Sequence, residues 1–318
     1  MMLLPLPPML MTPAYRFGAA TPWGGDGLMR VFGKEIPDSR TGESLEVSAI
    51  PGLESRDASG ASLTELIARY GERLTGKGLA SPFPLLLKLL DARETLSVQV
   101  HPDNVYAAQA EHKLGKTEAW HILYAAPGAQ LVYGVKAGTD KEQLMQASLA
   151  GAAVEQLLRR VDVKAGETYY IPAGMVHAIG EGIMLYEIQQ SSDVTYRFYD
   201  WERTDKNGNK RELHIQKAVD VTRTDFQMDA VREEEIAPGH YALLRKEYFC
   251  LDRFENGTFT LARDSRRFAF LTAVKDCVLN WPDGEMPLKG GHTALLPADG
   301  YDVQLKAGEA LLAYPTVK

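Results

Sequence analysis

The sequence predicts a mainly β fold, built from many short strands with a few helices at its edges. Short runs rich in Val, Ile and Tyr recur between residues 96 and 199, and Gly, Pro, Asp or Asn bounds most of them. Many short strands separated by tight turns are typical of a β-sandwich or barrel. Helical patterns are fewer, so we expect the helices to decorate a β core.

The expected strands follow one another along the middle of the chain. Their alternation of apolar and polar residues places successive side chains on opposite faces of a sheet. The six clearest runs are LSVQVH at 96–101, HILYA at 121–125, QLVYGV at 130–135, TYYIPA at 168–173, IMLYEIQ at 183–189 and VTYRFY at 194–199.

Helical patterns occur in five segments. Ser62 and Asp103 stand where helix N-caps are expected, and acidic residues follow Thr139 in the first turn of another segment. The five segments are 62–71, 103–112, 139–149, 154–160 and 213–222.

Composition limits the classes of partner. The formal net charge is -7 and the chain has no long basic run, which argues against nucleic acid. No stretch is apolar for long enough to span a membrane, and the proline-rich start lacks the positive charge of a signal peptide. Two cysteines, Cys250 and Cys277, form no disulfide framework. We therefore expect a protein of a reducing compartment, the cytoplasm.

A set of potential metal ligands lies on the predicted strands. In LSVQVH, Gln99 and His101 share one strand face, and Val98 and Val100 share the other. Glu118 enters the next strand, and His177 closes a Gly166, Pro172, Gly174, His177 pattern of fixed spacing. Inward-facing polar groups are costly unless they are satisfied, and a divalent metal would satisfy these. Nitrogen and oxygen ligands suit Zn²⁺, with Mn²⁺, Co²⁺ or Fe²⁺ possible. Five other histidines are expected to be surface or structural residues: His112, His121, His214, His240 and His292.

Several longer motifs resemble one known family. VQVHPD, GKTEAWHIL, IPAGMVHAIG and EIQQSSDVTYRFYDWER are similar to segments of the type I mannose-6-phosphate isomerases, especially the short bacterial form. TPWGGDGL and TGESLEVS also match the opening pattern of that family. These enzymes are zinc-dependent cupins. The resemblance implies a cupin jelly-roll barrel with zinc bound by Gln99, His101, Glu118 and His177.

The resemblance also implies a reaction, the interconversion of mannose 6-phosphate and fructose 6-phosphate through an enediol. This chemistry needs a proton acceptor near both reacting carbons, polarisation of the carbonyl and cations for the phosphate. We expect Glu187 or Lys116 to transfer the proton, and Arg197 and Lys88 to bind the charged substrate. Beyond Arg197, the segment SDVTYRFYDWER departs from the long forms of the family, so no other phosphate ligand is assigned.

The chain is expected to divide into three parts. Residues 1–14 are a flexible or wrongly assigned start, with Met11 as an alternative first residue. Residues 15–222 form the metal-binding cupin catalytic domain, and the polar turn 206–210 precedes its end. Residues 223–318 form a smaller, degenerate cupin-like β lobe without metal. In this lobe the spacing of the metal motif recurs at Gly291, Pro297, Asp299 and Asp302.

Two other functions are compatible with a metal-binding cupin. One is a sugar-binding cupin without turnover, which would act as a regulator or storage module. The other is a metal-dependent cupin oxygenase, although such enzymes prefer three protein ligands and open positions on iron.

Overall fold

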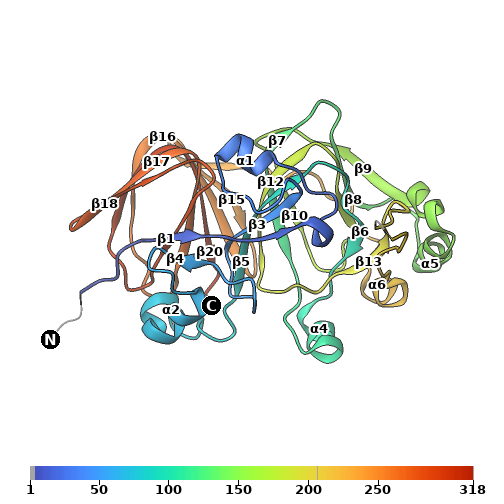
Figure 1. Ribbon diagram of the computed structural model, residues 1–318, viewed down its shortest axis with the longest axis horizontal. Helices are drawn as coiled ribbons and strands as arrows, with labels where there is room; N and C mark the ends of the chain where they lie inside the picture. The colour runs from blue at the N-terminus through green and yellow to red at the C-terminus, as the bar shows by residue number, and fades with distance from the viewer. Residues whose placement is uncertain (1–3, 206, 318) are drawn as a thin grey trace.

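The structure is a computed structural model that describes residues 4–205 and 207–317 (Figure 1). Residues 1–3 of the expected flexible start, Lys206 of the expected polar turn and Lys318 lie outside the described residues. The described chain forms three antiparallel sheets, which make up one barrel and one C-terminal lobe.

Two of the sheets form the first barrel. The six-stranded sheet has the order β10-β7-β12-β5-β3-β2 and the five-stranded sheet has the order β13-β6-β11-β8-β9. The strands of the six-stranded sheet are β2 (Ala14–Phe17), β3 (Thr41–Val47), β5 (Leu85–Ala92), β7 (Glu118–Ala125), β10 (Thr168–Ile171) and β12 (Ile183–Gln190). Those of the five-stranded sheet are β6 (Val98–Val100), β8 (Gln130–Val135), β9 (Leu158–Asp162), β11 (His177–Ile179) and β13 (Tyr196–Tyr199). The prediction of a mainly β, cupin-type barrel is confirmed.

The two sheets of the barrel share one apolar core. Leu90 and Trp120 from the six-stranded sheet pack in the same buried cluster as Tyr133 and Ile179 from the five-stranded sheet. Because strand side chains alternate between faces, the opposite faces of both sheets are free to pack elsewhere. The barrel interior is therefore enclosed on both sides, which keeps water away from polar groups placed there.

Strand β12 shows how the faces divide. Tyr186 and Ile188 belong to a cluster that reaches into the C-terminal lobe, whereas Leu185 packs inside the barrel. Glu187 and Gln189 share a strand face with Leu185, and both are buried. This alternation places Glu187 toward the barrel interior.

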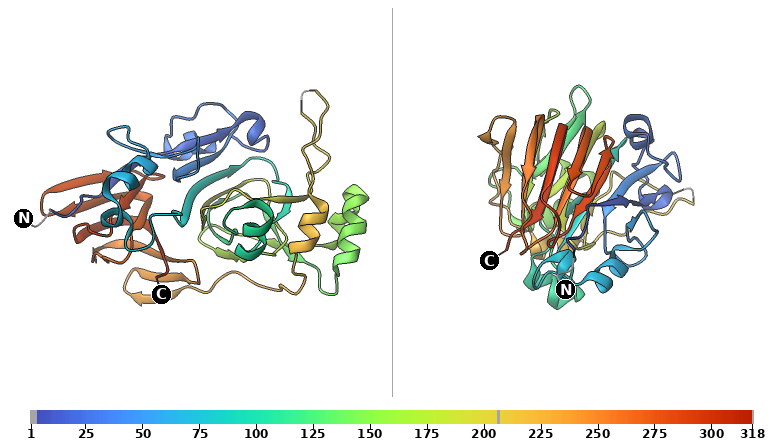
Figure 2. Two further views of the ribbon diagram at one scale, coloured as in Figure 1. Left: turned by 90° about the horizontal axis from the view of Figure 1, so that it is seen from below. Right: turned by 90° about the vertical axis from the view of Figure 1, so that its left-hand side faces the viewer.

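The third sheet forms most of the C-terminal lobe. It has nine strands in the order β14-β15-β16-β20-β17-β19-β1-β4, and β18 pairs with β17. The C-terminal strands are β14 (Glu234–Ala237), β15 (His240–Arg245), β16 (Phe249–Leu261), β17 (Ala269–Trp281), β18 (Gly284–Leu288), β19 (Thr293–Leu296) and β20 (Val303–Pro315). Figure 2 shows these strands, in orange and red, lying beside the barrel.

The other two strands of this sheet come from the other end of the chain. β1 (Met9–Thr12) pairs with β19 on one side and with β4 (Arg56–Asp57) on the other. Met11 is only 1% exposed. Residues 9–12 therefore belong to the edge of a sheet, and the expected flexible or wrongly assigned start stays a prediction.

The recurring glycine–proline motif of the C-terminal lobe has the local geometry of its counterpart. Gly166 and Gly291 both have positive φ, +90° and +78°, a conformation that favours glycine. A four-residue strand begins two residues after each, β10 and β19. This agreement supports the interpretation of the lobe as a degenerate second cupin.

The connection between barrel and lobe follows the barrel surface. α6 ends at Val221 and β14 starts at Glu234. Between them, Phe226 and Met228 pack against the barrel core and the Val231 amide donates to the Thr168 carbonyl. The boundary expected near residue 222 stays a prediction.

Helices lie outside the sheets, and Figure 2 shows α5 in green beside α6 in yellow at one flank of the barrel. The helices are α1 (Gly27–Phe32), α2 (Leu63–Tyr70), α3 (Glu72–Thr75), α4 (Asn104–Glu111), α5 (Lys141–Leu149) and α6 (Ile215–Val221), with 3₁₀ turns η1 (Gly18–Ala20) and η2 (Gly151–Leu157). Ser62 and Asp103 are N-caps, as expected, and Asp140 rather than Thr139 caps α5. The helix expected at 154–160 was wrong: a 3₁₀ turn ends at Leu157 and β9 follows, because 158–162 pairs with β8. Among the described residues, no helix is long and apolar enough to span a membrane.

We predict that the barrel and the lobe depend on one shared core for stability. Phe270, on β17, is fully buried in the cluster that joins Leu87 of β5 to Leu311 of β20. Phe270→Ala should lower the free energy of unfolding by about 3–5 kcal/mol, because it leaves a cavity between two sheets. Chemical denaturation measures this, with Leu149→Ala at an exposed helix end as the control. A loss no larger than that of the control would contradict a shared core.

Candidate metal centre

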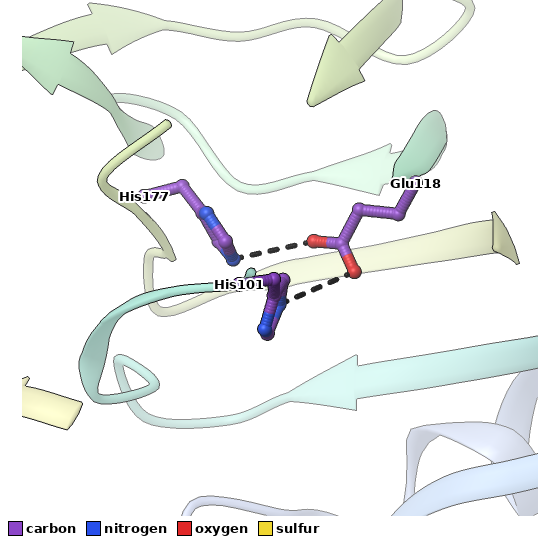
Figure 3. A group of neighbouring side chains, drawn as sticks. All are labelled: His101, Glu118 and His177. Carbon is purple, nitrogen blue, oxygen red and sulfur yellow. Dashed lines mark ion pairs between the residues drawn. The ribbon is translucent and has the colours of Figure 1, made fainter. Parts of the chain in front are cut away.

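Three buried side chains converge inside the first barrel (Figure 3). His101 follows β6, Glu118 begins β7 and His177 begins β11. One ligand atom of each lies within 4.8 Å of the others, and all three residues are 1% exposed or less. Strand pairing causes this convergence, since β11 lies beside β6 in one sheet and β7 crosses the barrel in the other.

The imidazoles point one nitrogen at the carboxylate and the other at the backbone. His101 Nε2 lies 3.5 Å from Glu118 Oε2, and His177 Nε2 lies 3.3 Å from Glu118 Oε1. His101 Nδ1 contacts the Val194 carbonyl at 2.9 Å, and His177 Nδ1 contacts the Met175 carbonyl at 2.8 Å. A carbonyl can only accept, so both Nδ1 atoms carry the proton and both Nε2 atoms present a lone pair.

The electrostatics of the cluster favour a cation between the ligands. Burial lowers the pKa of His177 to about 4, and burial, followed by the charge of Lys116, holds the pKa of His101 well below its usual value. Both rings are therefore neutral near pH 7, and Glu118 turns one oxygen toward the unprotonated Nε2 of each ring. Three groups of acceptors meeting in a dry interior repel one another, and a divalent cation would satisfy all of them. The residues present fit a metal ion.

Glu118 has one neighbouring cation in the protein itself. Lys116 Nζ lies 2.9 Å from Glu118 Oε2, and both side chains are buried. Burial raises the pKa of Glu118 to about 7, and Lys116 opposes this effect. The lysine therefore helps to keep the carboxylate ionised, as a metal ligand must be.

Gln99 lies next to the cluster. It is directly opposite His177 in the pairing of β6 with β11, so the two side chains share a sheet face. Val98 and Val100 are fully buried on the other face, against the helices. Gln99 therefore faces inward, where it lines a cavity of about 110 Å³ beside the cluster. Its role as the fourth ligand stays a prediction.

The same cavity contains every other residue that the sequence singles out for catalysis or substrate binding. Lys88, Lys116, Glu187 and Arg197 all line it. Its basic side chains are Arg16, Lys88, Lys116, Arg197 and Arg211, and its carboxylates are Glu43, Glu187 and Asp193. Basic groups outnumber acidic ones, which suits an anionic ligand.

Glu187 is held from two sides. Lys88 Nζ lies 3.1 Å from Glu187 Oε1, and Trp120 Nε1 donates to Glu187 Oε2 at 2.8 Å. Burial alone would raise the pKa of Glu187, but the ammonium groups of Lys88 and Lys116 lower it to about 2. The carboxylate is therefore ionised and fixed in one orientation. The Trp120 ring also meets His177 edge-on at 5.4 Å, so one indole contacts both the proposed base and a proposed ligand.

Lys88 is held between two carboxylates and is therefore not free to turn toward a phosphate. It is 4% exposed and, besides Glu187, lies 3.6 Å from Glu43 Oε2, which in turn pairs with Arg16 at 3.4 Å. Burial would lower the pKa of Lys88, but Glu187 and Glu43 raise it above its usual value. Lys88 is thus a charged member of a buried network at the edge of the cavity.

Arg197 lines the cavity from β13, where it lies directly opposite Gln99 of β6, and it is the least compensated cation in the cavity. Among the described residues no carboxylate lies within ion-pair distance of Arg197, and its buried Nε has no hydrogen-bond partner. Burial, then the charge of Arg211, lowers the pKa of its guanidinium, and Arg16 adds to the effect. Arg16 and Arg211 were missed in the sequence. Their own segments carry no signal, because only long-range pairing brings them to Arg197.

Two of the remaining histidines, His112 and His121, lie outside the cluster. His121 is buried and its Nδ1 contacts the Thr168 hydroxyl at 2.9 Å. His112 ends α4 with a left-handed backbone. In the part of the chain that the structure describes, neither belongs to a cluster that could hold a metal.

A jelly-roll barrel with a buried His–Glu–His cluster defines a class, the metal-binding cupins. Comparison with known proteins is more specific. A family model described as "Phosphomannose isomerase type I, catalytic domain" matches residues 18–120. The mannose-6-phosphate isomerase of Streptococcus mutans is 48% identical over 203 residues, which cover 63% of each chain. Mannose-6-phosphate isomerase ManA of Bacillus subtilis is 36% identical over 290 residues, 86% of this chain and 89% of its own length. The chain belongs to the type I mannose-6-phosphate isomerase family.

Solved structures agree with this assignment. The crystal structure of mannose 6-phosphate isomerase from Bacillus subtilis has a TM-score of 0.89 and 35% identity, and the match covers 97% of this chain and 99% of that one. A mannose 6-phosphate isomerase solved with zinc and yttrium bound has a TM-score of 0.80 at 17% identity, so it shares the fold.

We predict an order of importance among the proposed ligands. His101→Ala and His177→Ala should each lose most of the bound metal, because each removes a buried imidazole donor. Gln99→Ala should lose less, since a neutral amide oxygen is the weakest donor of the set. Elemental analysis of each purified variant measures the metal per chain, and His121→Ala is the matched control. A full metal content in His177→Ala would contradict a ligand role, and two ions per chain in the unaltered protein would contradict a metal-free C-terminal lobe.

Proposed function

We propose that the cluster and the adjoining cavity interconvert mannose 6-phosphate and fructose 6-phosphate by an aldose–ketose isomerisation through an enediol. The observation that carries the proposal is the buried His101–Glu118–His177 cluster, which lies beside a basic cavity in a member of this family. The proteins named mannose-6-phosphate isomerase among its relatives support the substrate class. Neither a non-catalytic sugar-binding cupin nor a cupin oxygenase is favoured by these relatives.

The metal is proposed to be Zn²⁺, with Mn²⁺ or Co²⁺ as substitutes. Gln99, His101, Glu118 and His177 would hold it through two imidazoles, a carboxylate and an amide. A bound divalent metal supplies Lewis-acid polarisation of the sugar oxygens.

The phosphate is proposed to bind beside Arg197 in the cavity. Arg197 has donors that no carboxylate of the described residues occupies, and guanidinium groups bind phosphate oxygens in a bidentate manner. Arg211 is fixed beside it by two contacts to Asp200, of 2.7 Å and 2.5 Å, and Arg16 is fixed by Glu43. The three guanidinium groups repel one another, so a dianion placed among them relieves that repulsion.

Glu187 is proposed to move the proton between C1 and C2. Its carboxylate is ionised, buried and oriented by Lys88 and Trp120, so one oxygen can serve both neighbouring carbons. In the free protein its low pKa makes it a weak base. A phosphate dianion in the same cavity opposes the lysine charges and raises that pKa, so the base gains strength when substrate binds.

Lys116 and Lys88 are proposed to place their positive charges beside the sugar, where they can donate to its oxygens. Lys116 Nζ lies next to Glu118 and lines the cavity, where its ammonium can donate to an oxygen on C1 or C2 as negative charge develops. Lys88 keeps Glu187 ionised and is a second donor for the substrate. We also propose the cytoplasm as the compartment, since sugar phosphates are intracellular metabolites and both free cysteines are buried.

Removal of the metal tests the proposal as a whole. Exhaustive chelation should abolish turnover of mannose 6-phosphate in a coupled assay, and added Zn²⁺, Mn²⁺ or Co²⁺ should restore it. The reason is that the site loses the Lewis acid that would polarise the sugar oxygens. Full activity in a sample that elemental analysis finds free of metal would refute this mechanism.

A substitution at Arg197 should separate recognition of phosphate from chemistry. Arg197→Ala should lower kcat/KM for mannose 6-phosphate by roughly 30- to 150-fold, because a desolvated guanidinium–phosphate contact contributes about 2–3 kcal/mol. Residual turnover of free mannose should change little. Arg223→Ala is the control, since Arg223 is exposed and pairs with Asp225 outside the cavity. Equal losses for both sugars would assign Arg197 to the reacting carbons instead.

Substitutions at Glu187 and Trp120 should affect both sugars alike. Glu187→Gln should lower kcat by roughly 10²- to 10⁴-fold, because it removes the proton acceptor and keeps the shape. Trp120→Phe should lower kcat by roughly tenfold or more with little change in KM, since it removes the hydrogen bond that orients the carboxylate. Steady-state kinetics on metal-replete protein decide this. An unaffected kcat in Glu187→Gln would contradict Glu187 as the base and would assign that role to Lys116.

A further inference from the structure

The C-terminal lobe contains a cavity that plays no part in the proposed reaction. Its volume is about 480 Å³, compared with about 110 Å³ for the cavity beside the metal cluster. Phe254, Leu261 and Val303 contribute to its wall and belong to the lobe's own core cluster. The cavity thus occupies the side of the sheet that faces away from the first barrel, where the core of the degenerate cupin is incompletely filled.

Polar side chains are buried at one end of this cavity. Asp252, on β16, is 4% exposed. The Tyr314 hydroxyl donates to Asp252 Oδ2 at 3.1 Å, and Arg245 Nη2 lies 2.5 Å from Oδ1. His240 Nε2 is buried without a hydrogen-bond partner and lies 3.6 Å from Asp252 Oδ2, beyond normal hydrogen-bond length. A carboxylate, a phenol and an unused imidazole nitrogen therefore meet on the cavity wall.

The charges that line this cavity are already compensated. Asp252 pairs with Arg245, and Arg267 pairs with Asp264 at 2.9 Å. Arg263 lies 3.3 Å from Asp299. This differs from the catalytic cavity, where Arg197 has no carboxylate partner among the described residues. A charged ligand would gain little here, so the natural occupant is neutral.

The rest of the wall is aromatic and apolar. The His240 ring stacks on Phe254 with centroids 4.3 Å apart, and Phe259 meets Phe254 edge-on at 5.0 Å. Tyr301 and Tyr314 also line the cavity. Concave sites that join aromatic surface to a few convergent polar groups are suited to small molecules with one apolar face and several hydroxyls.

We propose that this cavity is a second binding site, specific for a neutral pyranose sugar. Its ring would pack on Phe254 and Phe259, and its hydroxyls would bond to Asp252, His240 and Tyr314. The carboxylate accepts from sugar hydroxyls, and His240 Nε2 gains the partner that it lacks. The site is independent of the isomerase reaction, because it shares no lining residue with the catalytic cavity.

The test uses the full-length, metal-loaded protein and methyl α-D-mannopyranoside, which is neutral and cannot ring-open. Mannose 6-phosphate at saturating concentration occupies the catalytic cavity during the measurement. Isothermal titration calorimetry and saturation-transfer NMR should then detect a single pyranoside site per chain. The same binding should persist in Arg197→Ala.

Two variants locate the site. His240→Phe keeps the stacking on Phe254 and removes the ring nitrogens, and Tyr314→Phe removes one hydroxyl. Each should weaken pyranoside binding by roughly tenfold, as expected for the loss of a buried hydrogen bond to a polar ligand, and leave isomerase activity unchanged. Tyr241→Phe, on the same lobe but outside the cavity, should bind as the unaltered protein does.

Four outcomes would overturn the proposal. They are no detectable binding of the pyranoside, displacement of the pyranoside by mannose 6-phosphate, unchanged binding in both His240→Phe and Tyr314→Phe, or binding of a nucleoside such as guanosine in place of the sugar.

Discussion

Three acceptor groups that face one another in a dry interior form the constraint on which the rest of the molecule depends. Each imidazole donates its Nδ1 proton to a backbone carbonyl, so its Nε2 lone pair points toward Glu118. The lone pairs and the carboxylate repel one another unless a metal ion lies between them. Three different strands must therefore hold them in register while water is kept out. The enclosed barrel keeps water out, and the packing of Val98 and Val100 against the helices fixes the strand before His101. Lys116 pairs with the Glu118 carboxylate and helps to hold it in place.

The C-terminal lobe packs against the outer face of the strands that carry this arrangement. β5 and β12 each place one face toward the cavity and the other in the core shared with the nine-stranded sheet. Lys88 and Glu187 are paired across β5 and β12, and their neighbours Leu87, Leu89, Tyr186 and Ile188 are fixed in that core. A shift of the lobe would move the strands that carry the proposed base. The lobe thus contributes rigidity to a site that it does not touch.

Local patterns in the sequence predict much of the barrel and part of the site. Period-2 alternation located the strands and put Glu187, Gln99 and His101 on inward faces, because one face of a strand must be buried. Three of the four proposed ligands are brought within 4.8 Å of one another. Arg16 and Arg211 were not foreseen, since their position depends on pairing between distant strands. The same is true of β1, which reads as a loose apolar start until the edge of β19 is known. Residues 158–160 continue a helical pattern, but their pairing with β8 overrides it.

The pairing of β1 with β19 also bears on how the chain is made. Met9 lies opposite Leu295, so this strand is synthesised long before its partner in the sheet. At about 5–20 residues per second this delay is roughly 15–60 s. The edge of β1 that faces β19 stays unpaired through that interval, while β4 and the barrel strands that follow are already available for pairing. Completion of the nine-stranded sheet is therefore a late event in folding, and the apolar residues of β1 stay without their β19 partner until that strand has been made.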